Sequence, residues 1–204
     1  MNRGQLRSAL ISRLGIPPVG DGLLDQSELN NIIGYALRDL SSEHDWPWLL
    51  TSASLTFTSG VATSPSTLVK VRDLVVNGRR AKYVPLTAFL DASAAGVECV
   101  WTDTGTSIRL TPAPSTAPTA TLWYVQGEPA LGVDTASPLV PDAHHQMVVA
   151  RASYLANTRR NRMEEAQRDD NEYQMGLRKM RDASWSKTGP RTVRPAGVAL
   201  WASW

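Results

Sequence analysis

The stretch from Pro141 to Trp185 constrains the fold most, because it runs without an internal proline. Asp142 is a good N-cap for a helix that begins at Ala143, and Gly189-Pro190 is a stop signal. Its apolar residues recur at three- and four-residue steps, the spacing of one helix face. They are Val148, Ala152, Leu155, Met163, Ala166, Tyr173, Leu177 and Met180. A polar run at 157–162 interrupts this face, so one continuous helix and two helices that break there both fit.

The apolar stripe also has a consequence for assembly. A continuous helix over this stretch is roughly 65 Å long at about 1.5 Å per residue. A chain of 204 residues is too small to cover a stripe of that length from within. We therefore expect part of it to meet neighbouring subunits, and we assign subunit packing to Leu155, Tyr173, Leu177 and Met180.

Two shorter helices are expected before the first strand. Residues 3–14 place Leu6, Leu10 and Ile11 on one face, and Gly15 ends that helix. Residues 27–45 form the second, with Ser27 as the N-cap candidate. The second helix ends before Pro47, because a proline ring pushes the preceding residue out of the helical region.

The hydrophobic period changes after Trp46-Pro47-Trp48. Residues 54–58 alternate as a strand does, and residues 68–76 are rich in β-branched side chains. Asn77-Gly78 is a strong hairpin signal, so residues 80–84 are expected to return beside 68–76. Residues 99–102 and 107–110 form a second expected hairpin, and 119–125 a further strand in which Leu122 and Tyr124 face away from Trp123.

These patterns predict an α+β fold. A mainly α-helical body contains a helix pair and a long C-terminal helix or helix pair, and it carries an inserted antiparallel β domain and an extended C-terminal tail. The expected parts are N-terminal helices at 1–45, the β region at 46–126, a loop and long helical region at 127–185, and a docking tail at 186–204.

Composition and motifs argue against an enzyme. The formal net charge is +2, and one cysteine excludes an internal disulfide framework and a cysteine-based zinc site. Phosphate-binding, nucleophile-elbow and zinc-protease motifs are absent from the sequence. We expect His144-His145 to be a surface pair in the first helical turn, and Glu164-Glu165 and Asp169-Asp170 to be a solvated face. No cofactor or metal is therefore expected.

Two clusters have alternative interpretations. Arg159, Arg160 and Arg162 form the densest basic patch, which suits nucleic-acid phosphates; acids of a neighbouring subunit or of the same helix, such as Glu164 for Arg160, are the other possible partners. Trp46-Pro47-Trp48 suits stacking on a base or sugar, but a hydrophobic hinge between helix and sheet explains it more simply.

The tail carries basic and apolar residues without an acid. Prolines and glycines prevent a compact element, yet the last residues are too apolar for a solvated tail. We expect this tail to dock on a partner through Arg191, Arg194, Leu200, Trp201 and Trp204. The first residues lack a signal peptide and no apolar run is long enough to cross a membrane, so we expect a cytoplasmic product without a membrane partner.

The order of features over about residues 25–185 resembles the head-to-tail adaptor (connector) proteins of tailed double-stranded DNA bacteriophages. The resemblance rests on an ordered set of motifs and also extends, more loosely, to the tail tubular proteins of short-tailed phages. The motifs are Asp45-Trp46-Pro47-Trp48, the strand and turn at 68–78, Thr106–Pro114, Leu122-Trp123-Tyr124 and Pro138-Leu139-Val140-Pro141 before a helix.

The resemblance implies a structural protein of the virion neck, assembled in the bacterial host cytoplasm. Its copies would form a homo-oligomeric ring, a dodecamer, beneath the portal protein and above a downstream neck or tail protein. Double-stranded DNA would pass through the lumen, and the tail would dock on the portal. A nucleic-acid-binding assembly module and a tubular or neck component lower in the tail are the alternatives. The missing site chemistry argues against a ligand-binding or hydrolytic β domain.

Overall fold

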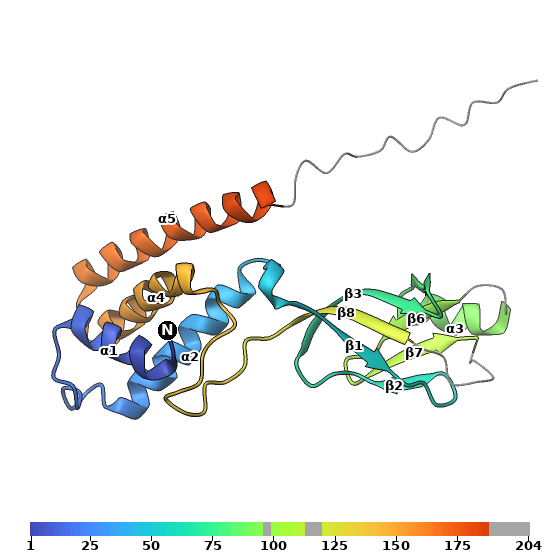
Figure 1. Ribbon diagram of the computed structural model, residues 1–204, viewed down its shortest axis with the longest axis horizontal. Coiled ribbons are helices and arrows are strands. Elements are labelled where there is room, and N and C mark those ends of the chain that lie inside the picture. Colours follow the sequence, from blue (N-terminus) through green and yellow to red (C-terminus); the bar gives the residue numbers. More distant parts are fainter. Residues whose placement is uncertain (96–98, 113–119, 188–204) are drawn as a thin grey trace, which may run out of the picture.

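In the computed structural model, which describes residues 1–95, 99–112 and 120–187, helices and strands separate into two parts. A helical body and a β domain lie end to end along the long axis of the molecule (Figure 1). The α+β prediction is confirmed. The body contains α1 (Arg3–Leu14), α2 (Gln26–Ser42), α4 (His145–Arg159) and α5 (Met163–Lys187).

The first two helices begin at side-chain caps. Asn2 caps α1 in a capping box with Gln5, and Gly15 ends the helix in the left-handed conformation, with φ of 61°. Asp25, and not the predicted Ser27, caps α2 by accepting a hydrogen bond from the Glu28 amide at 2.7 Å. The second helix ends at Ser42, a few residues earlier than predicted.

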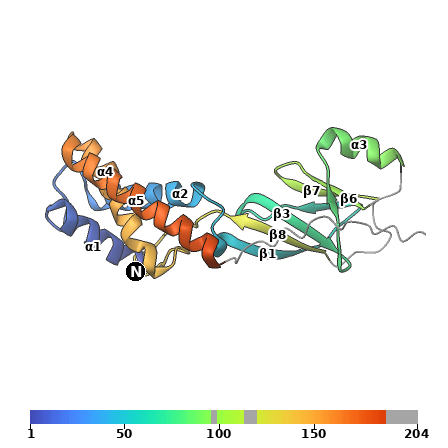
Figure 2. The ribbon, with the colours of Figure 1, turned by 90° about the horizontal axis from the view of Figure 1, so that it is seen from above.

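The long C-terminal pattern forms two helices, with the break inside the polar run. Asn161 has a φ of 57°, and the Arg162 amide donates to the Asn157 carbonyl at 2.9 Å, which closes the end of α4. The start differs from our prediction: Asp142–His144 is a short 3-10 turn and α4 begins only at His145. Because of the break, α5 folds back along α4 and the two helices cover each other (Figure 2).

The body has one hydrophobic core, to which all four helices contribute. Leu6 and Leu10 of α1 and Ile32 of α2 are fully buried there. Val125, near the end of the last strand, also belongs to this core, so the β domain is anchored in the body.

The β domain is a sandwich of two sheets with strand orders β1-β8-β3-β4 and β2-β7-β6-β5. Its core combines side chains of both sheets, such as Leu74 and Leu122 from one and Trp101 and Ile108 from the other. The strands are β1 (Leu50–Leu55), β2 (Val61–Thr63), β3 (Leu68–Val76), β4 (Arg79–Arg80), β5 (Lys82–Tyr83), β6 (Val100–Asp103), β7 (Ser107–Thr111) and β8 (Ala120–Gln126).

Several strand predictions are confirmed and two are corrected. The strand at 68–76, the second hairpin and the strand at 119–125 are present, and Trp123 faces away from buried Leu122 and Tyr124. The first strand is Leu50–Leu55 rather than 54–58, because it pairs along β8 from Leu50 with Val125 to Leu55 with Ala120. A helix that we did not predict, α3 (Leu86–Ala95), packs on β6 and β7.

The predicted return strand at 80–84 divides between the two sheets at Ala81. The Ala81 amide donates to the Leu74 carbonyl at 2.8 Å, which ends the pairing of β4 with β3. Lys82 and Tyr83 then pair with β6, and this pair is parallel. The domain is therefore antiparallel apart from this short contact among the described strands.

Candidate assembly surfaces

The predicted docking residues Arg191, Arg194, Leu200, Trp201 and Trp204 lie outside the described residues. The described chain continues as helix to Lys187, just beyond the predicted boundary at 185. Near its end, Arg181 donates to the carboxylate and the carbonyl of Glu43 at 2.9 and 3.1 Å. The last turns of α5 are thus tied to the end of α2, next to the β domain.

The apolar stripe packs within a single chain. Tyr173, Leu177 and Met180 are buried in the core of the body, and Leu155 is half-buried against it. Burial raises the pKa of the Tyr173 hydroxyl to about 12. The fold-back of α5 covers the length that we expected to need neighbouring subunits, so the physical reason for that expectation does not hold at these residues. A subunit contact there stays a prediction that a single chain does not test.

The three arginines at the α4–α5 turn do not behave alike. Arg159 pairs with Glu28 of α2. The Arg160 side chain is 10% exposed, pairs with Asp21 at 3.0 Å and donates to the Leu14 carbonyl at 3.4 Å. The suggested pair of Arg160 with Glu164 is therefore replaced by contacts with the loop after α1. Arg162 is exposed.

A buried polar cluster joins α1, α4 and α5. Asp169, 1% exposed, accepts hydrogen bonds from Arg13 at 2.7 Å, from the Ser153 hydroxyl at 2.6 Å and from the Asn157 amide at 2.9 Å. Arg13 also pairs with Glu172 at 2.6 Å; this bond lowers the pKa of Glu172 and raises that of Arg13. The prediction of a solvated face is wrong at Asp169, because α1 and α4 pack against this side of α5 and supply the partners of its buried carboxylate.

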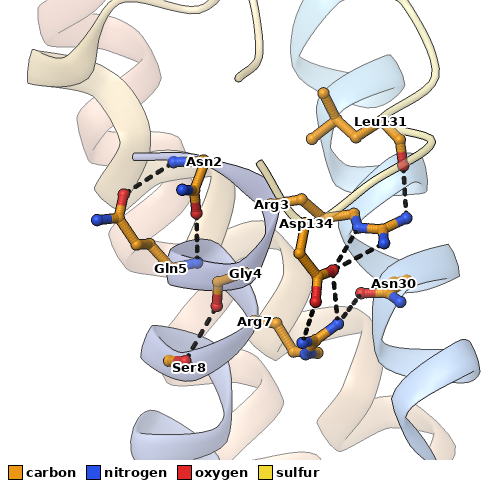
Figure 3. Close-up of polar contacts among 9 residues, drawn as sticks. All are labelled: Asn2, Arg3, Gly4, Gln5, Arg7, Ser8, Asn30, Leu131 and Asp134. Carbon is orange, nitrogen blue, oxygen red and sulfur yellow. Dashed lines mark hydrogen bonds and ion pairs between the residues drawn. The ribbon is translucent and has the colours of Figure 1, made fainter. Parts of the chain in front are cut away.

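A second polar cluster fastens the loop after β8 to α1 (Figure 3). Arg3 and Arg7 both reach Asp134, with ion-pair distances of 2.7 Å each, and Arg3 also donates to the Leu131 carbonyl at 2.7 Å. Arg7 donates further to Asn30 of α2 at 3.1 Å. The hydrogen bonds from Arg7 and Arg3 lower the pKa of Asp134 to about 2. We call this cluster, Arg3, Arg7 and Asp134, the loop latch.

The Trp46-Pro47-Trp48 cluster forms the joint between the two parts. Trp46 is fully buried, its indole nitrogen donates to the Leu40 carbonyl at 2.7 Å, and its ring stacks on Trp48 at 4.8 Å. Asp45 pairs with Lys70 at 2.9 Å and with Arg72, and the Lys70 hydrogen bond is the largest cause of its lowered pKa. The hinge interpretation is confirmed, since these residues connect the end of α2 to β1 and β3.

His145 departs from the predicted surface pair. It is 2% exposed, and its ring nitrogens lie 2.8 Å from the Val140 carbonyl and 2.6 Å from the Met1 α-amino nitrogen. Burial lowers its pKa. His144, which lies in the 3-10 turn, faces the Trp48 ring at 5.5 Å. The two rings therefore belong to the packing between the turn and its neighbours.

Sequence reasoning missed the polar clusters because their partners lie on different elements, and the pairs of Arg13 with Asp169 and of Arg7 with Asp134 join residues more than a hundred positions apart. Within the described ranges, no group of three or more histidine, cysteine, aspartate or glutamate residues has the arrangement of a metal site. In the same part of the chain, no helix has both the length and the apolar character needed to span a bilayer.

Comparison with models of known protein families gives a match over nearly the whole chain. The family model described as SU10 adaptor protein matches residues 1–196, which include the helical body, the β domain and the beginning of the tail. Nothing among the curated proteins matches the chain.

Proposed function

The chain belongs to the SU10 adaptor protein family, and from this premise we propose that it is the head-to-tail adaptor that connects a phage portal to its tail. The observation that carries the proposal is the extent of the match, residues 1–196, because it spans both structural parts rather than one motif. Membership in this family assigns the protein to the structural proteins of a phage virion, and no enzymatic activity is proposed.

The copies form a ring beneath the portal, a dodecamer, and the genome passes through its lumen. The helical body supports this proposal because a ring that holds a capsid and a tail together needs subunits that keep their shape. Ion pairs connect α1 with α5, α2 with α4, and the loop after β8 with α1. The ring in turn contacts a downstream neck or tail protein at its other end.

The tail docks on the portal. Trp201 and Trp204, with Leu200, enter clefts between portal subunits, and Arg191 and Arg194 meet acidic side chains or carbonyls there. Tryptophan is enriched where a short segment anchors in a pocket, and repeated copies in a ring add to the attachment through avidity. Because an extended segment gains little from its own chain, the free protein is a monomer or small oligomer and the ring forms on the portal.

A truncation tests the docking role directly. A chain that ends at Lys187 keeps every described residue, so its circular dichroism spectrum should equal that of the full chain. Binding to DNA-filled heads that carry a portal should be lost, and Trp201→Ala with Trp204→Ala should weaken it strongly. Arg162→Ala, which changes an exposed residue of the body, serves as the matched control. If heads bind the truncated chain as tightly as the full one, the docking role is wrong.

The alternative of a nucleic-acid-binding module has weaker support. Arg159 and Arg160 are engaged with Glu28 and Asp21 of the same chain, so phosphate binding would have to break these pairs. The free chain should therefore bind DNA only weakly. A strong affinity that falls steeply with salt concentration would favour the alternative over the adaptor role.

A further inference from the structure

Large apolar side chains are exposed on two faces of the β domain. One face is the open side of the β1-β8-β3-β4 sheet, where Trp123 of β8 is 43% exposed and pairs across the sheet with Ser52 of β1. The other is the outer side of α3 and β5, where Tyr83, Leu86 and Leu90 are 56%, 46% and 60% exposed. We call the first the Trp123 face and the second the α3 face.

The two faces lie on opposite sides of the sandwich. Side chains alternate along a strand, and because Leu122 and Tyr124 point into the core between the sheets, Trp123 points away from it. On the other sheet, α3 packs on β6 and β7 and buries Phe89. Figure 2 shows the resulting order of layers: α3, then β7 and β6, then β3, β8 and β1.

The shapes and charges of the two faces complement each other. Leu86 and Leu90 are one turn apart on α3 and form a short apolar ridge, whereas the Trp123 face is the outer side of a sheet. The described part of α3 carries one charged side chain, that of exposed Asp91 next to Leu90. The Trp123 face carries Arg80, which is 80% exposed although it pairs with Asp73 at 2.5 Å. A carboxylate from the α3 face can therefore meet a guanidinium on the Trp123 face.

We propose that the α3 face of one copy packs on the Trp123 face of the next copy in the ring. The contact is heterologous, because two different surfaces meet and every copy uses both of them. Contacts of this kind close into rings when the rotation between copies allows it, so one interface is enough to join all subunits. This inference rests on the proposed function and adds to it the surfaces through which the β domains of neighbouring subunits meet.

Disulfide trapping in assembled particles tests the contact. Exposed Cys99 is first replaced by serine, and Leu90→Cys and Trp123→Cys are then combined in one chain. Particles that carry this chain are purified, blotted to measure how much of it they contain, and oxidised before non-reducing electrophoresis. Because the two cysteines of one chain lie on opposite faces, they can pair only between copies. Each copy then bonds to two neighbours, and the gel should show a ladder of dimers, trimers and larger species.

Three controls make the result specific. Leu90→Cys alone and Trp123→Cys alone should stay monomeric, since each interface then has one thiol. Met175→Cys combined with Trp123→Cys should also stay monomeric, because Met175 is as exposed as Leu90, at 59%, but lies on α5 of the helical body. Ser52→Cys replaces Trp123→Cys as the acceptor if loss of the indole reduces the amount of folded chain, since Ser52 is the exposed neighbour on β1.

Each other outcome contradicts the proposal in a different way. Particles that contain the chain but give no ladder with either acceptor show that the two faces do not meet. Dimers from Leu90→Cys alone show a two-fold contact between α3 faces instead. A ladder from the Met175 pair shows that thiols meet by collision rather than at an interface. Particles that lack even the unsubstituted chain overturn the proposed function, and this interface with it.

Discussion

The helical body and the β domain are held together by different interactions. In the body, charged side chains connect helices that are far apart in sequence, as Arg13 does with Asp169 and Arg151 with Asp39. In the β domain, Asp73 and Arg80 belong to neighbouring strands of one hairpin and their pair lies at the surface. The domain is stabilised mainly by the apolar layer between its sheets.

This difference separates two tasks of an assembling subunit. Hydrogen bonds and ion pairs are directional, so the clusters in the body fix how its helices sit on one another. Apolar packing specifies geometry less strictly, and the β domain leaves large apolar side chains exposed on two faces. We infer that the body keeps the shape of the subunit while the β domain supplies surface for its neighbours.

The largest effect is expected at Asp169. Asp169→Ala leaves Arg13, Ser153 and Asn157 without their shared acceptor in a buried place, and should lower the free energy of unfolding by about 3–5 kcal/mol. Asp170→Ala is the matched control. The Asp170 carboxylate is 29% exposed and meets Arg151 at 3.5 Å, so its removal should lower the free energy of unfolding by less than about 1 kcal/mol. Urea unfolding of the two variants measures both. Equal losses would mean that the cluster does not hold the body together.

The next largest effect is expected in the apolar stripe. Leu177→Ala should destabilise the isolated chain by about 2–5 kcal/mol, because the side chain is buried among α-helices of its own chain. Leu155→Ala should cost less, since that side chain is half-buried. Thermal unfolding of the dilute protein is the measurement. A Leu177→Ala variant that keeps the unfolding temperature of the wild type but fails to assemble would instead assign the apolar stripe to subunit contacts.

At the α4–α5 turn, two neighbouring arginines should differ. Arg160→Ala removes the ion pair with Asp21 from a nearly buried position and should cost about 1–3 kcal/mol. Arg162→Ala changes an exposed residue and should alter stability by less than about 0.5 kcal/mol. The denaturation midpoints of both variants decide the comparison, and a larger loss at Arg162 contradicts it.

The loop latch predicts a dependence on acidity. The pKa of Asp134 is lowered from 3.8 to about 2 by Arg7 and Arg3. The stability that its charged carboxylate contributes is therefore fully present above about pH 5, declines below about pH 4 and disappears as the pH falls through about 2. The difference in stability between the wild type and Asp134→Asn should therefore be constant above pH 5 and shrink below pH 4. Denaturation series at several pH values measure it, and a difference that grows in acid has the wrong sign.

The smallest effect on stability is expected on the α3 face. Leu90→Ser should change the free energy of unfolding by less than about 0.5 kcal/mol, because the side chain is largely exposed in the single chain. The same variant should reduce assembly into particles. Chemical denaturation and particle yield are measured together. A Leu90→Ser variant that is clearly less stable but assembles normally would mean that Leu90 supports the fold of the β domain and not a contact between subunits.

Local patterns in the sequence predicted most elements and few of the tertiary contacts. The strand Leu68–Val76 follows from its β-branched composition, and the polar run at 157–162 marked the place where a helix break was one of two alternatives. Both signals are properties of neighbouring residues. The helix α3 was missed because Leu86–Ala95 is short and carries hydrophobic residues on several sides, so no periodic polar face marks it. Asp169 was assigned to a solvated face because its partner Arg13 cannot be identified from helical spacing.

The joint between the two parts, the proposed contact face and the loop latch were predictable to different degrees. The Trp46-Pro47-Trp48 joint could be recognised because a change of hydrophobic period surrounds it. The exposure of Leu86 and Leu90 could not, since it depends on which side of α3 rests on β6 and β7. Loop geometry, which places Asp134 against Arg3 and Arg7, is likewise a result of the complete fold.

The insertion of the β domain sets an order of events during synthesis of the chain. The apolar faces of α1 and α2 are covered largely by α4, which the ribosome makes only after the whole β domain. At about 5–20 residues per second, the interval between Ser42 and Arg159 is roughly 5 to 25 seconds. During that interval the sandwich, whose strands all lie between Leu50 and Gln126, can fold first. Until α4 is made, the leucines and isoleucines of the two N-terminal helices stay largely uncovered. We therefore expect chaperones of the infected cell to bind the nascent chain.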